Sequence, residues 1–196
     1  LNHELMASCR ARLGEASRNL VAIRELSVGE GAGRLGILVD QLRGENQVVL
    51  NGVVRLLGHL GDTGVVGDLV ERLSADDEEA RENAIELLEN IADRDLLDHL
   101  LPLLESDEEE QLRMARTASG WFSVELDQLL SYLLGAADPW TQMAAVWSAT
   151  ILERDELFAA AEEKLGGQAR EILKELREKR EGGGMNGEDE PLTTME

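Results

Sequence analysis

The chain has 196 residues, of which 43% are hydrophobic and only 3% aromatic, so any core must be built mainly from Leu, Val, Ile and Ala. Its net charge of −21 at pH 7 repels phosphate backbones and anionic lipid headgroups, which disfavours nucleic acid and membrane surfaces as partners. The lone cysteine, Cys9, excludes an intramolecular disulfide and fits a reducing compartment.

Residues 1–45 are predicted to form an N-terminal helical cap. The apolar spacing predicts a long helix from about Asn2 to Leu26, and the glycine-rich stretch at 29–33 predicts a loop. A short second helix is expected over 34–42. We expect this hairpin to cover the open end of the helical array that follows.

Residues 46–165 repeat with a period of 31 and then 30 residues. Each unit has apolar residues at i, i+3, i+4 and i+7, then a polar turn, then a second apolar run, which predicts a helical hairpin. The four predicted units cover 46–74, 76–105, 107–134 and 137–165, and equivalent first-helix positions are Val53, Ala84, Met114 and Ala144, followed by Leu57, Leu88, Ala118 and Ser148. Stacked hairpins bury their stripes in one continuous core, so an α-solenoid is expected.

Acidic clusters mark the predicted starts of several units. Examples are the stretches 76–79 and 106–109, and in the fourth unit Asp138 is followed by Pro139. Carboxylates at a helix start accept from unpaired N–H groups and compensate the helix dipole, and proline is tolerated at the first helical position. Because no cluster has the spacing of a calcium loop, we interpret them as helix caps.

The end of the chain is predicted to contain one more helix and then a linker. A charged helix from Gln168 to Glu181 is expected to close the array as a C-terminal cap spanning 166–181. Residues 182–196 begin with three glycines and are polar and acidic without periodicity, so they are predicted to be a flexible linker.

The helix pairs, with a proline-opened unit at Asp138 and Pro139, resemble HEAT repeats. More narrowly, the stretches RENAIELLEN at 81–90 and LLPLLE at 100–105 resemble a HEAT segment of certain bacterial proteins. In those proteins the repeats join an ADP/ATP-carrier-like membrane region to a cyclic-nucleotide-binding domain. The final five residues, 192–196, are similar to the phrase that leads into that nucleotide domain.

This resemblance implies an all-α fold, a right-handed, armadillo-like α-solenoid of about four HEAT-like hairpins with terminal capping helices. It also implies a non-enzymatic scaffold, a connector between a transporter-like membrane region and a nucleotide sensor. The implied location is cytoplasmic, with a tether to the inner membrane through a region N-terminal to this sequence. Two alternatives stay open: a free-standing protein–protein interaction module that binds a basic partner, and an enzyme resembling the helical-repeat bilin lyases.

The sequence predicts no catalytic, cofactor-binding or metal-binding residues. His3, His59 and His99 have no metal-ligand spacing, and no phosphate loop or nucleophile motif occurs. In a solenoid the second helices line the inner curve, so residues off their apolar stripes are predicted to face a partner. This candidate inner face consists of Asp68, Glu71, Arg72, Asp98, His99, Gln128 and Tyr132. Since the chain is acidic, the complementary surface should be basic.

Two tryptophans, Trp140 and Trp147, are seven residues apart and therefore share one helix face. One interpretation is that they fill gaps between the third and fourth units. The other is that they are exposed aromatic anchors for a partner, because tryptophan dominates binding hot spots.

Overall fold

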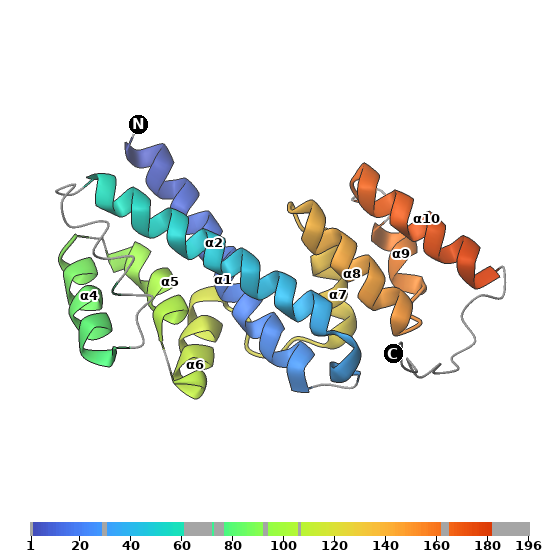
Figure 1. Ribbon diagram of the computed structural model, residues 1–196, viewed down its shortest axis with the longest axis horizontal. Helices are drawn as coiled ribbons and strands as arrows, with labels where there is room; N and C mark the ends of the chain where they lie inside the picture. The colour runs from blue at the N-terminus through green and yellow to red at the C-terminus, as the bar shows by residue number, and fades with distance from the viewer. Residues whose placement is uncertain are drawn as a thin grey trace, which may run out of the picture. The chain divides into compact units, whose positions relative to one another are not determined.

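The computed structural model describes residues 2–28, 31–60, 72, 77–91, 94–105, 107–161 and 165–181 (Figure 1). Nearly all of them are helical: α1 (Asn2–Val28), the 3-10 turn η1 (Ala32–Arg34), α2 (Gly36–Leu60), α4 (Glu78–Ile91), α5 (Arg94–Leu104), α6 (Glu108–Ser119), α7 (Leu126–Leu134), α8 (Pro139–Ile151), α9 (Glu156–Ala161) and α10 (Gly167–Glu181). No strand occurs in this part of the chain, so the predicted all-α class is confirmed. The chain divides into two compact units, unit 1 (Leu1–Leu129) and unit 2 (Leu130–Glu196).

Unit 1 is organised around α1. This helix runs antiparallel beside α2 and also packs against α5 and α6 (Figure 1). Cys9, Leu13 and Ala16 of α1 belong to one buried cluster with residues of α2, α4 and α5. Helix α1 is therefore an internal part of the core of unit 1, a role that the prediction of an end cap did not include.

The second predicted helix is much longer than expected. The sequence predicted a short helix ending at Leu42 and a new helix beginning near Asn46, but α2 continues without a break to Leu60. The physical reason is that the buried stripe is continuous, since Leu38, Leu42, Asn46, Val49 and Val53 are all buried. The expected helix break inside α2 is therefore wrong.

Buried polar groups connect α1 to α2. The Asn19 side chain donates to Oδ1 of Asn46 over 3.1 Å, and Nδ2 of Asn46 donates to the carbonyl oxygen of Ala16 over 3.1 Å. Ser17 donates to the carbonyl of Leu13 one turn earlier. Each of these buried polar side chains thus has a hydrogen-bond partner, as burial requires.

The predicted repeat positions that unit 1 describes are buried or half-buried. Leu88, Leu100 and Leu104 all lie in the buried cluster, and Ala118 is half-buried. The side chain of Leu57 and the second helix of the first predicted hairpin fall outside the described residues. The continuous core predicted along the whole array is therefore described for unit 1 only.

In unit 2, α8 packs against α10 (Figure 1). Helix α10 buries one stripe, formed by Ala169, Leu173 and Leu176. A helix at 168–181 is thereby confirmed and begins one residue earlier than predicted, whereas its role as a cap stays a prediction. The predicted linker at 182–196 lies outside the described residues.

The capping chemistry predicted from the acidic clusters is confirmed. Oδ1 of Asp107 accepts from the backbone N–H of Glu110 over 2.8 Å, and Oδ2 of Asp138 accepts from the N–H of Thr141 over 2.6 Å. Asp77 accepts in the same way from the first turn of α4. These local bonds satisfy N–H groups that a helix start leaves unpaired.

Candidate functional site

The structure brings together two of the seven residues predicted for the inner face. Asp98 and His99, both on α5, line the same cavity. On α7, Gln128 is exposed and Tyr132 half-buried. Arg72 is half-buried, and Asp68 and Glu71 lie outside the described residues.

The cavity beside Asp98 and His99 has a volume of about 520 Å³ and lies between α1, α5 and α6 of unit 1. Its lining residues are Arg10, Asp98, His99, Leu101, Arg113, Met114, Thr117 and Ala118. Sequence reasoning did not find Arg10, because α1 was expected at the end of the array and not beside the second and third hairpins. Arg113 was missed because it lies on a first helix, which was expected to face away from the inner curve.

The polar groups that line this cavity carry both signs of charge. Arg10, Arg113 and Asp98 all line it, and the guanidinium of Arg113 is paired with Glu110. Nδ1 of His99 is buried and has no hydrogen-bond partner within the described part of the chain.

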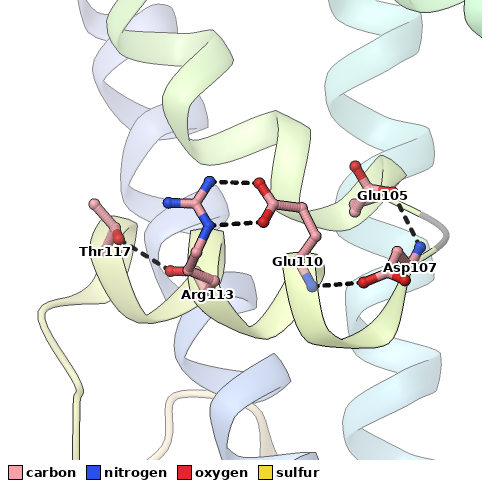
Figure 2. Close-up of polar contacts among 5 residues, drawn as sticks. All are labelled: Glu105, Asp107, Glu110, Arg113 and Thr117. Atoms are coloured by element: carbon pink, nitrogen blue, oxygen red, sulfur yellow. Dashed lines mark hydrogen bonds and ion pairs between the residues drawn. The ribbon is translucent and has the colours of Figure 1, made fainter.

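The guanidinium of Arg113 is held in place by its own helix. Figure 2 shows both oxygens of Glu110 accepting from Arg113, with Nε to Oε2 at 2.7 Å. The hydrogen bond to Arg113 lowers the pKa of Glu110, and the same bond raises the pKa of Arg113. Oδ1 of Asp107 accepts from the backbone N–H of Glu110, so the residue that pairs with Arg113 also takes part in the helix cap (Figure 2).

A second cavity, of about 350 Å³, lies between α1, α2 and α6. It is lined by Leu20, Ile23, Arg24, Ser27, Arg43, Glu108, Gln111 and Leu112. Arg43 at its edge already pairs with Asp40 at 3.4 Å, with both side chains exposed. The hollow therefore offers an apolar floor with one further arginine, Arg24, and one carboxylate.

The two tryptophans of α8 lie on its exposed side. Trp140 is 67% exposed and Trp147 37% exposed. Gap filling, the first of the two interpretations, therefore does not describe Trp140. The anchor role stays a prediction.

Metal, thiol and membrane features were also considered. Within the described residues no group of three or more His, Cys, Asp or Glu side chains is placed to hold a metal ion. Cys9 is buried, and desolvation raises its pKa, opposed by the charge of Arg12. Over the same part of the chain, no helix combines the length and apolarity needed to cross a bilayer.

Comparison with known families supports the repeat assignment. A family model for HEAT repeats matches residues 36–119, which run from the start of α2 to the end of α6. Searches of curated proteins and of solved structures gave no significant match. The match supports a HEAT-repeat segment in the chain, and the all-helical structure together with this match fits an α-solenoid of helical hairpins.

Proposed function

We propose that this chain is a non-enzymatic HEAT-repeat scaffold that binds a basic protein partner. The observation that carries the proposal is the HEAT match over 36–119, which covers most of the helices that form the core of unit 1. Stacked helical repeats present extended surfaces for partners. The net charge of −21 favours a basic surface on the other side.

The test is selection of random peptides on the immobilised full chain at physiological salt. Enriched peptides should carry net positive charge, and their affinity should fall as salt rises, because the Debye length is about 8 Å at 0.15 M. The matched control is Leu88→Asp, which keeps the acidic character but should lose the folded surface. Peptides that bind both proteins equally, or whose binding ignores salt, would contradict the proposal.

The finer version of this function is a connector between a membrane region and a nucleotide-binding domain. Its support is the resemblance of residues 81–90 and 100–105, and the matched segment 36–119 includes both. An antibody against 36–119 should then detect, in cells that express the natural gene, a polypeptide far larger than 21.5 kDa in the membrane fraction. A band near that mass in the soluble fraction would instead favour the free-standing module.

A further inference from the structure

Helix α8 exposes its largest side chains and buries small polar ones. Trp140 and Trp147 are outward, and Met143 and Ile151 on the same side are half-buried. The buried face consists of Thr141, Gln142, Ala144, Ala145, Val146, Ser148, Ala149 and Thr150. This reverses the usual distribution, in which large apolar side chains are inside and polar ones outside.

A hydrogen bond from the buried face to a residue outside the helix holds this orientation. Oε1 of Gln142 accepts from the backbone N–H of Gly166 over 2.9 Å. The hydroxyl of Thr150 is satisfied within the helix, where it donates to the carbonyl of Val146. Turning α8 about its axis to bury Trp140 would break the contact with Gly166. The outward aromatic stripe is therefore a consequence of how unit 2 packs.

The stripe is also uncharged. Residues 139–151 contain no Asp, Glu, Lys or Arg, although charged residues make up 30% of the chain. From Trp140 to Ile151 the stripe extends about 17 Å, or three helical turns. An exposed apolar stripe of this kind is typical of an interaction site, and tryptophan is the residue most enriched in binding hot spots.

The negative charge of the chain favours a basic protein segment as the partner of this stripe. A second copy of the chain would bring −21 against −21, and an anionic lipid surface would be repelled in the same way. Glu153 and Glu156, just beyond the end of α8, are exposed. Carboxylates just beyond the end of the stripe and indole faces within it both attract lysine or arginine.

We propose that the outer face of α8, formed by Trp140, Met143, Trp147 and Ile151, docks a helical segment of a partner protein whose apolar stripe is flanked by lysine or arginine. Partner helices commonly bind by laying an apolar face along such a surface. The inference rests on the proposed scaffold function and assigns its partner-binding surface to unit 2.

The test uses the full chain with Trp121→Phe, so that tryptophan emission reports on Trp140 and Trp147 alone. The probe is a 13-residue helical peptide of leucine and lysine, matched to α8 in length. Without the peptide, acrylamide should quench the emission. Saturating peptide should shift the emission to the blue and reduce the quenching constant at least twofold.

Two variants locate the contact. Trp140→Ser should weaken the peptide at least tenfold, the usual effect of losing a hot-spot tryptophan. The matched control is Phe122→Ser, since Phe122 is 67% exposed like Trp140 but lies outside α8. This variant should bind the peptide with the same affinity as the parent chain. Glu153→Lys should weaken peptide binding about threefold, because it reverses a charge just beyond the end of the stripe. Circular dichroism melting checks that each variant is folded.

Three outcomes would overturn the inference. They are equal binding of a leucine–glutamate peptide of the same length, protection of the indoles by phosphatidylserine vesicles, and protection by self-association in sedimentation equilibrium. The Trp140→Ser variant can be tested with the leucine–lysine peptide and with the peptides enriched in the random selection. If it binds both as tightly as the parent chain does, this inference fails and the scaffold function stands. If no peptide binds the folded chain, both fail.

Discussion

Helices α4 and α8 are equivalent in the repeat predicted from the sequence but use opposite chemistry. Position for position, Leu88 of α4 corresponds to Ser148 of α8, and each is only 1% exposed. Their neighbours Leu87 and Trp147 are also equivalent and are 39% and 37% exposed. The register of burial is therefore preserved between the two helices while the residue types change.

The difference shows what each helix contributes. Helix α4 carries five glutamates and buries leucine, so its outward side is an ordinary solvated surface. Helix α8 has no charged residue and buries Ser, Thr, Gln and Ala. Burying these small polar side chains gains less free energy than burying leucine, and the large apolar area stays available for a partner.

The largest effect should come from a charge in the α4 core. Leu88→Asp should lower the free energy of unfolding by about 4 kcal/mol or more, because it buries an unpaired carboxylate. Leu87→Asp, at the adjacent exposed position, is the matched control and should change it by less than about 1 kcal/mol. Urea unfolding followed by circular dichroism measures both, and equal midpoints would show that the register is wrong.

A smaller loss is expected at the polar contact of α8. Gln142→Ala removes the acceptor of the Gly166 N–H and should destabilise the chain by about 1–2 kcal/mol. Gln168→Ala, an exposed glutamine of α10, serves as the control. If thermal melting gives the same midpoint for the two variants, the contact does not hold α8 in its orientation.

The opposite sign is expected at Ser148. Its buried hydroxyl has no hydrogen-bond partner among the residues that the structure describes. Ser148→Ala should therefore stabilise the chain by about 1 kcal/mol, since it removes an unsatisfied polar group and favours helix. The equivalent change in α4, Leu88→Ala, should destabilise by about 2–5 kcal/mol. Calorimetry that finds both changes destabilising would remove the contrast between the helices.

The smallest effect is expected at Glu110, whose ion pair with Arg113 is on the surface. Its pKa is lowered from the ordinary 4.5, so its stabilisation is present above that pH and is lost as pH falls through the lower folded value. Glu110→Ala should thus lower the melting temperature slightly at pH 7, and this deficit should shrink as the solution is made more acidic. Exposed Glu109→Ala is the control. A deficit that persists in acid would rule out the ion pair as its cause.

Features set by local chemistry could be predicted from the sequence. The helix starts at Asp107 and Asp138 depend on hydrogen bonds that span only three residues, and both were correctly placed. The repeat period also located Leu88, Leu100 and Leu104, all of which are buried. Short-range capping and periodicity therefore carry much of the fold.

Features set by long-range packing could not. The core position of α1 depends on contacts with α5 and α6, which are distant in sequence. The buried polar residues Ser17 and Asn19 also interrupt the apolar stripe of α1, so the sequence pattern did not indicate that this side of the helix is buried. The cavity lined by Arg10 and His99 follows from that same placement. Helix α8 lacks a charged face, so periodicity alone could not decide whether Trp140 points inward or outward.

The amide bridge between Asn19 and Asn46 has a consequence for how many arrangements this pair of helices can adopt. Sliding α1 along α2 by one turn would strand both amides in an apolar seam, while leucine-rich stripes would match almost as well after the slide. The bridge therefore specifies one register of α1 against α2. Replacing both asparagines with leucine should leave the helical content intact but broaden the NMR resonances of the α1–α2 seam, as alternative registers come into exchange.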